Sequence, residues 1–237
     1  MMSAESNWLD SSNGRGLLQE ESDQVARALE SVFGDYLVQI GSWGPQDLFL
    51  RHSRTRRTVL LGWNQADSPD AMVCADSLGV ASDSVDAVLL PHVLETVSDP
   101  IAILREVDRI LRPEGHIVVL GFNPVSWWGC RHRISRTGYP PETKRHIPER
   151  RMSDWLRLLN FTISYASRYY PVAQAGTSLA GQQQPVIQKW RNWNAFNPGY
   201  MLVACKELFT LTLVRPSPRR RTSLVGGLVN PTTRNVA

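Results

Sequence analysis

Apolar residues follow two different periods within residues 75–124 of this chain. Residues 87–90 form a short continuous apolar run, as expected for a strand that helices cover on both faces. From residue 101 the apolar positions recur at helical spacing, and residues 116–122 form a second apolar, β-branched run. This pattern predicts a strand, a helix and a second strand. Such a βαβ unit implies a parallel sheet and a right-handed crossover.

The predicted helix of this unit has clear signals at both ends. Asp99 stands at the cap position, where its carboxylate can accept free backbone N–H bonds, and Pro100 occupies the first turn, where no N–H is needed. The apolar face consists of Ile101, Leu104, Val107, Ile110 and Leu111. A Pro-Glu-Gly sequence at residues 113–115 predicts the end of the helix.

Similar patterns predict the remaining elements. A helix at residues 20–33, ended by Gly34, precedes the sheet, and a short helix is expected at residues 47–52. Another amphipathic helix begins near Pro148. Further strands are expected at residues 36–40, 58–63, 71–74, 161–165 and 199–206.

Length and composition fit one α/β domain with additions. The chain has 237 residues, of which 42% are hydrophobic and 20% are charged, as is ordinary for a soluble protein. We expect a domain at residues 20–210, with a basic lid or insertion at about residues 129–148. Residues 1–19 are expected to be a disordered N-terminus, and residues 211–237 a basic disordered tail.

The sequence also indicates the cellular compartment of the protein and argues against disulfide and metal chemistry. No apolar stretch approaches the roughly 20 residues that cross a bilayer, and the N-terminus lacks the apolar core of a secretory signal. We therefore expect a cytoplasmic protein without a membrane partner. The three cysteines are far apart, which argues against a disulfide framework or a zinc site, so no metal is expected. The net charge of +4 is mild, although the arginines are clustered.

The residues of the βαβ unit carry a resemblance to a known family. They include Asp76 after the third predicted strand, a Ser-Val-Asp turn at residues 84–86 and an Arg-Ile-Leu-Arg-Pro-Glu-Gly step at residues 109–115. In this order they resemble the second half of a class I S-adenosylmethionine-dependent methyltransferase of the methyltransferase-11 kind. Residues 121–124 and 126–129 are similar to a small bacterial branch of that family, with a degenerate glycine loop.

The resemblance implies both a fold and an activity. The fold would be a Rossmann-like, mostly parallel seven-stranded sheet with helices on both faces and an antiparallel C-terminal hairpin. The activity would be transfer of a methyl group from S-adenosylmethionine to an unidentified acceptor. Displacement at a sulfonium methyl needs alignment and desolvation more than acid–base chemistry, which suits a sequence with few catalytic motifs.

The same resemblance implies a set of cofactor-binding residues. They lie in the loops after the first four strands of the sheet. The family pattern places there Gly41, Ser42, Gly44, Trp63, Asn64, Asp76, Ser77, Leu78, Leu90 and Pro91.

Three positions depart from the family pattern. Gln39 stands near the place of an acid, and Trp43 interrupts the expected glycine series between Gly41 and Gly44. Asn64 stands near the end of the second strand, where the family has a carboxylate for the ribose hydroxyls. An amide oxygen can still accept one hydroxyl hydrogen bond, but without the strength that charge adds. Weakened or unusual binding on the ribose side is therefore expected.

Other residues after the strands are candidates for the reaction or for acceptor binding. His92 is a weak candidate for a general base, and packing is the more ordinary role of such a histidine. Glu95 is expected to be a solvated charge at a helix end. Trp127 and Trp128 either wall a substrate pocket or pack the roof of the core. The basic loop suggests an acidic acceptor or RNA, although a solvated loop explains most of its charges.

Two other classes of function compete with the enzyme. One is a catalytically inactive methyltransferase-like module that binds RNA or an acidic partner through the basic loop and tail. The other is a nicotinamide oxidoreductase, which would need a fuller Gly-x-Gly-x-x-Gly sequence with a downstream acid and therefore ranks far below. The acceptor and the oligomeric state are not encoded in any recognisable pattern.

Overall fold

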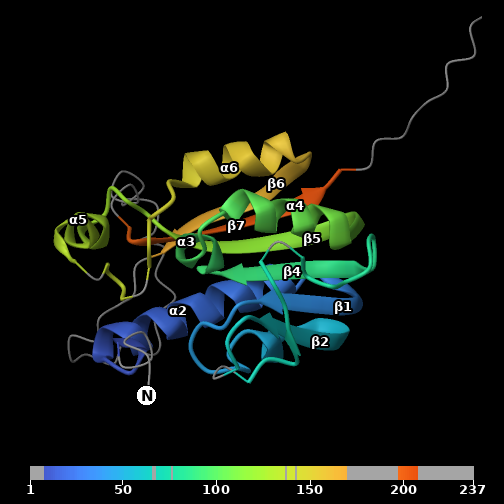
Figure 1. Cartoon of the computed structure of the whole chain (residues 1–237), viewed down its shortest axis with the longest axis horizontal. Coiled ribbons are helices and arrows are strands. Elements are labelled where there is room, and N and C mark those ends of the chain that lie inside the picture. Colours follow the sequence, from blue (N-terminus) through green and yellow to red (C-terminus); the bar gives the residue numbers. More distant parts are fainter. Residues whose placement is uncertain are drawn as a thin grey trace, which may run out of the picture.

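A single seven-stranded sheet forms the centre of the molecule (Figure 1). The computed structural model describes residues 8–65, 68–75, 77–136, 138–141, 143–169 and 197–207. The strand order is β3-β2-β1-β4-β5-β7-β6. The strands are β1 (Phe33–Ile40), β2 (Arg54–Gly62), β3 (Ala71–Met72), β4 (Val85–Pro91), β5 (Leu111–Phe122), β6 (Phe161–Tyr169) and β7 (Gly199–Lys206).

The direction of the strands confirms the predicted fold class. Strands β1 to β5 pair in parallel, whereas β7 runs antiparallel to both β5 and β6. From β1 the chain first moves outward to β2 and β3, and then returns to the other side of β1 with β4. The carboxyl ends of β1 and β4 therefore flank the point at which the strand order reverses. Open α/β sheets bind ligands at this point.

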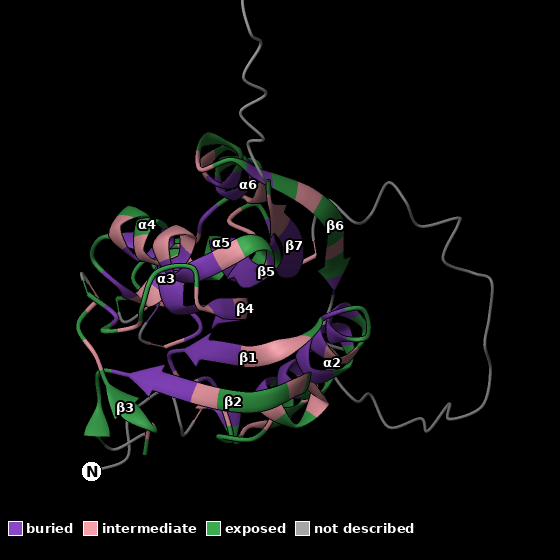
Figure 2. Ribbon diagram, turned by 90° about the vertical axis from the view of Figure 1, so that its right-hand side faces the viewer, coloured by how far each residue is buried: buried purple, intermediate pink, exposed green. Residues whose placement is uncertain are grey.

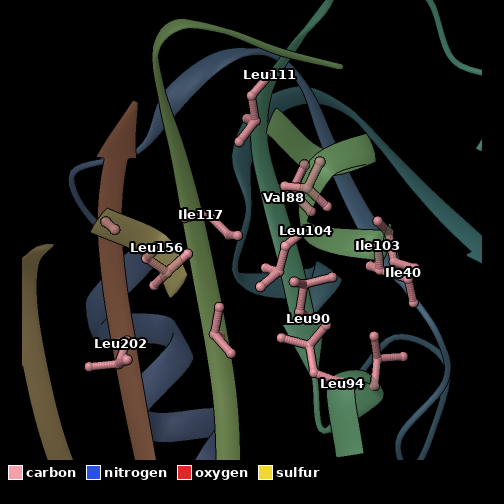
Figure 3. Close-up of a cluster of buried hydrophobic side chains, with 14 of the residues drawn as sticks. Ile40, Val88, Leu90, Leu94, Ile103, Leu104, Leu111, Ile117, Leu156 and Leu202 are labelled. Carbon is pink, nitrogen blue, oxygen red and sulfur yellow. The ribbon is translucent and has the colours of Figure 1, made fainter. Parts of the chain in front are cut away.

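Helices cover both faces of the sheet (Figure 2). On one face lies α2 (Ser12–Leu29), and on the other lie α3 (Val93–Thr96), α4 (Pro100–Ile110) and α6 (Glu149–Leu158). The remaining helical segments are η1 (Leu50–His52) and α5 (Trp127–Ile134). Figure 3 shows the core on the α4 side, where Leu104 packs among strand residues such as Val88, Leu90 and Ile117.

The α4 helix begins where the sequence predicts it, but it ends at Ile110, and Leu111, predicted on its apolar face, already begins β5. The carboxylate of Asp99 accepts hydrogen bonds from the backbone N–H groups of Ile101 (2.9 Å) and Ala102 (3.1 Å). These bonds satisfy donors that the first turn leaves unpaired. The sequence alternates between the core and solvent as the 3.6-residue period requires, and its buried residues are Pro100, Ile103, Leu104, Val107 and Ile110.

The N-terminal helix differs from its prediction. It begins at Ser12, within the stretch expected to be disordered, and it ends at Leu29, so Phe33 already belongs to β1. Ser11 caps the helix by accepting a hydrogen bond from the N–H of Gly14 (3.2 Å). The buried Leu17 and Leu18 extend the apolar stripe of the helix by a full turn. Burial of this stripe outweighs the unfavourable helix propensity of the nearby glycines.

Several other boundaries shift by a few residues. Strand β3 is shorter than predicted, β6 is longer, and the predicted helix at residues 47–52 is the single turn η1. Residues 1–7, most of the connection between β6 and β7, and the predicted tail at residues 211–237 lie outside the described residues.

The α4 side of the core offers a direct test of packing. We predict that Leu104→Ala lowers the free energy of unfolding by about 2–5 kcal/mol, because it leaves a cavity beneath α4. Leu104 is fully buried, whereas Leu158 on α6 is 79% exposed. Leu158→Ala is therefore the matched control and should change stability by less than about 0.5 kcal/mol. Equal effects of the two substitutions in chemical denaturation would contradict this packing.

Candidate functional site

The loop after β1 approaches neighbouring segments closely at Gly41. Its backbone has a φ of +77°, which side chains other than glycine rarely adopt. A Cβ atom at this position would lie 2.1 Å from Cγ2 of Val93 and 3.7 Å from the ring of Trp63. The N–H of Gly41 also donates to the carbonyl of Leu61 (2.8 Å). The structure thus brings together the loops that follow β1, β2 and β4, and it requires glycine where they meet.

The tryptophan that interrupts the glycine series does not face solvent. Trp43 is 2% exposed, and its indole N–H donates to Oε2 of Glu21 on α2 (2.9 Å). The following Gly44 again has a positive φ of +73°, and a Cβ there would lie 2.8 Å from Leu18. Ser42, between Gly41 and Trp43, is half-buried. The side chain of Trp43 therefore anchors this loop to α2.

Gln39 lies at the position where the family has an acid. It is 1% exposed, and its side-chain N–H donates to the carbonyl of Gly41 (3.0 Å). Its Oε1 atom is buried and accepts no hydrogen bond from the residues that the structure describes. A buried acceptor without a donor costs free energy, so this atom suits a ligand that carries an N–H or ammonium group.

The loops after β2 and β3 contain the other predicted cofactor residues. Trp63 is 39% exposed and Asn64 is exposed. Asp76 lies outside the described residues. The N–H of Ser77 donates to the carbonyl of Cys74 (3.1 Å), and the N–H of Leu78 donates to Glu106 on α4 (3.1 Å). These two backbone donors are therefore engaged within the protein.

The side chains of Leu78 and Leu90 belong to the core and not to an open surface. Both are 1% exposed or less and pack in the cluster on the α4 side of the sheet. Pro91 is also buried and ends β4. The side chains of Leu78, Leu90 and Pro91 therefore support the carboxyl edge of the sheet from inside the core.

His92 forms the centre of a buried charge network. This network consists of Glu21, His92 and Glu95, which are all 1% exposed or less. Nε2 of His92 lies 2.7 Å from Oε1 of Glu21, and Nδ1 lies 3.1 Å from Oε2 of Glu95. The hydroxyl of Tyr169 also donates to Oε1 of Glu21 (3.0 Å). Both ring nitrogens of His92 are thus engaged.

The network keeps His92 charged. Burial alone would lower the pKa of His92, but the charges of Glu21 and Glu95 and their hydrogen bonds outweigh it and raise the pKa to about 9. Burial raises the pKa of Glu95, and its hydrogen bonds from His92 and from backbone N–H groups only partly offset this effect. At neutral pH the ring therefore donates from both nitrogens and has no lone pair for a base.

The expectation that Glu95 is a solvated charge is wrong. Its Oε1 accepts hydrogen bonds from the N–H groups of Phe122 (2.8 Å) and Ile147 (3.3 Å). The backbone carbonyl of Glu95 accepts hydrogen bonds from the backbone N–H groups of Lys144 (3.0 Å) and Arg145 (3.3 Å). Glu95 is buried because two segments from later in the chain, the end of β5 and residues 143–147, fold over it.

Aromatic rings enclose His92 on both sides. The ring of His92 stacks on Phe122 at 3.9 Å between centroids and lies 4.5 Å from the ring of Trp43. Phe122 in turn lies 6.0 Å from Trp128, which is 6% exposed. Trp128 therefore packs the roof of the core, whereas Trp127 is 76% exposed. The two adjacent tryptophans have different roles.

Part of the basic loop is held by the protein itself. The guanidinium of Arg131 lies over the ring of Tyr139 at 4.2 Å, and Arg145 donates to the carbonyls of Val97 and Ser98. Burial and the nearby His132 lower the pKa of His146 to about 3, so this residue carries no charge at neutral pH. Arg133 and Lys144 are exposed. Within the described ranges, no group of His, Cys, Asp and Glu is arranged to hold a metal ion.

Comparisons with known proteins agree with this geometry. Residues 59–119 match the family described as a methyltransferase domain. A methyltransferase in complex with the Haloferax volcanii Trm112 methyltransferase activator covers 88% of this chain and 100% of its own, with 15% identity and a TM-score of 0.58. A geranyl diphosphate methyltransferase in complex with SAM covers 79% and 84%, with 16% identity and a TM-score of 0.57. Residues 59–119 are thus similar to a methyltransferase domain, and the chain has the fold of these solved methyltransferases.

One curated relative is similar in sequence. It is the "Uncharacterized protein YafS" of Escherichia coli (strain K12), with 40% identity over 129 residues. The match covers 52% of this chain and 53% of YafS, so it spans about half the length of that protein. No helix among the described residues combines the length and the apolar content needed to cross a bilayer.

The sequence contains a signal that Glu21 is buried, and the predictions above did not include it. The apolar stripe of α2 continues through Leu17, Leu18, Val25 and Ala28, and Glu21 occupies the same stripe at helical spacing. A carboxylate on the buried face of a helix needs a partner. The partner His92 lies 71 positions away in the sequence, so it could be found only once the methyltransferase fold was known.

The charge state of His92 predicts how stability depends on pH. The folded-state pKa of about 9 lies above the usual 6.5, so the folded protein keeps a proton that the unfolded chain releases. Its stabilising contribution is complete below about pH 6.5 and is lost as the pH rises through about 9. We predict that the free energy of unfolding falls across this window, by up to about 1 kcal/mol per pH unit. The raised pKa of Glu95 acts in the same direction.

Chemical denaturation of the protein between pH 6 and 9.5 measures this effect. His116→Gln is the control, because burial lowers the pKa of His116 and its contribution has the opposite sign, below pH 6.5. The control should keep the decline, and His92→Gln should flatten it. A stability that stays constant or rises between pH 6.5 and 9 would show that His92 is not held as an imidazolium.

Proposed function

We propose that this protein is an S-adenosylmethionine-dependent methyltransferase that acts on an acceptor still to be identified. The observation that carries the proposal is the meeting of three loops at Gly41, at the switch point of a methyltransferase sheet. The sequence match to a methyltransferase domain and the similarity to an enzyme solved with SAM support it. The comparisons do not favour the alternative of an inactive binding module for RNA or an acidic partner.

The fit of the cofactor is better on its methionine side than on its ribose side. The positive φ of Gly41 and Gly44 keeps the loop after β1 tightly turned, with the side chains of Val93 and Leu18 packed beside the two glycines. The orphaned oxygen of Gln39 suits the α-ammonium group of a methionine moiety. Trp63 and Asn64 offer a ring face and an amide in place of a carboxylate. We therefore assign Gly41, Ser42 and Gly44 to the methionine part, and Trp63 and Asn64 to the ribose.

The adenine part is assigned to the loop after β3. There Asp76 would accept from the exocyclic amino group, next to Ser77 and Leu78. Because the N–H groups of Ser77 and Leu78 bond within the protein, Asp76 would supply most of the polar recognition of the base. Leu90 and Pro91 support this edge from the core.

The chain contributes alignment and exclusion of water to the reaction. When bound, S-adenosylmethionine supplies an electrophilic methyl group that an O, N or C nucleophile can accept. His92 is not assigned as the general base, since its ring is buried and protonated and both nitrogens are engaged. We assign it instead to positioning, because it fixes the loops after β1 and β4 relative to α2. No residue is assigned to deprotonation of the acceptor.

Isothermal titration with S-adenosylmethionine and S-adenosylhomocysteine tests this proposal. Saturable binding is expected, and Asp76→Ala should weaken it about 10- to 100-fold, through loss of a charged hydrogen bond. Asp154→Ala is the matched control, because Asp154 is an exposed aspartate on α6, and it should bind as the wild type does. Gly41→Val should abolish binding, because its Cβ would meet Val93.

Two results would count against the enzyme. The absence of binding heat at millimolar ligand would leave the inactive module as the better explanation. Equal affinities of the Asp76→Ala and Asp154→Ala variants would place the ligand elsewhere. Salt-sensitive binding of RNA by a protein that ignores the cofactor would identify the module directly.

A further inference from the structure

Helix α5 presents an apolar stripe to solvent. Its outward face consists of Trp127, Cys130, Arg131 and Ile134, which follow one another at three- and four-residue spacing and so lie on one side of the helix. Trp127 is 76% exposed and Ile134 is 85% exposed, and Val125 just before the helix is 63% exposed. Ordinary helices turn such a stripe toward the core. In α5 the adjacent Trp128 takes the inward position instead.

The outward face is shaped for a flat partner. Together with Ser135, its residues line an open groove of about 380 Å³. In Figure 1, α5 projects from one end of the molecule, on the side where β5 ends. Trp127 and Ile134 are 76% and 85% exposed on this face, so both side chains can insert into a soft boundary.

Positive charges accompany the apolar stripe. Arg131 lies on the outward face itself, Arg133 lies beside it and Arg136 follows the end of α5; all three are exposed. The sequence contains no Asp or Glu between residues 115 and 141. An apolar stripe with tryptophan, bordered only by cations, is the pattern of helices that lie in the headgroup region of anionic membranes.

We propose that the outward face of α5 docks on an anionic lipid surface. Trp127 and Ile134 enter the boundary between headgroups and acyl chains, and Arg133 and Arg136 contact the lipid phosphates. The sequence-based expectation of no membrane partner considered only segments that cross a bilayer. A helix that lies on the surface needs neither the length nor the uniform apolarity of a crossing segment.

Co-sedimentation of the full chain with lipid vesicles tests this proposal. Binding is expected to vesicles that contain phosphatidylglycerol, to weaken with added salt, and to be much weaker with pure phosphatidylcholine. The double variant Trp127→Ser with Ile134→Ser should lower the partition coefficient about tenfold or more. The double variant Arg133→Gln with Arg136→Gln should lower it about fivefold per arginine.

Matched variants on other surfaces distinguish binding through the outward face of α5 from non-specific adsorption to the vesicles. Phe33 and Leu158 are 65% and 79% exposed, so Phe33→Ser with Leu158→Ser removes a similar apolar area elsewhere. Arg56→Gln removes a cation whose side chain is 84% exposed. Both controls should bind vesicles as the wild type does, and circular dichroism checks that every variant is folded.

Three results would overturn the proposal. The first result is a wild-type protein that does not bind anionic vesicles. The second is equally strong binding by the Trp127→Ser with Ile134→Ser variant, which attachment through the arginine-rich residues 215–221 would give. The third result is concentration-dependent self-association that disappears in the Trp127→Ser with Ile134→Ser variant while vesicles are ignored. In that case the outward face is an interface between two copies of the chain.

Discussion

The arrangement of the loops at the carboxyl edge of the sheet depends on one buried contact. In it, the carboxylate of Glu21 pairs with the imidazole of His92. Through this network α2 is joined to the loops after β1 and β4, and Glu95 adds the end of β5 and residues 143–147. Buried charges are tolerated only when they are paired and hydrogen-bonded. Here each carboxylate oxygen of the two glutamates has at least one donor. Removal of one partner from such a network typically costs about 3–5 kcal/mol.

This network explains how the loop after β1 keeps its tight turn although Trp43 interrupts the glycine series. Trp43 would crowd the loop if its ring faced the ligand. Its indole instead points into the core, where it bonds Glu21 and packs against His92. His92 itself has a left-handed backbone with a φ of +55°, a conformation that costs about 1–3 kcal/mol outside glycine. The hydrogen bonds and stacking of its ring offset that cost. The charge network therefore holds the loop after β1 in place beside the loop after β4.

The sequence predicted those parts of the molecule that depend on local signals. Asp99 and Pro100 gave the start of α4, although the helix ends at Ile110, before the stop predicted at residues 113–115, and β7 was predicted without error. The order of the sheet followed from a family resemblance. By contrast, the start of α2, the burial of Glu95 and the role of Glu21 depend on contacts between segments far apart in the chain. Composition misled at residues 12–19, because the glycines there suggested disorder while the leucines were already part of the core.

A crystal structure of the protein with S-adenosylhomocysteine tests the central claim most directly, namely that this network supports a nucleoside site. We expect the ligand to lie across the carboxyl ends of β1 and β2, with its amino acid part against Gly41. We also expect that Trp43 still bonds Glu21, and that His92 still lies between Glu21 and Glu95. A ligand bound at another surface, or one that enters only after Trp43 and His92 leave their places, would show that the network does not support the site.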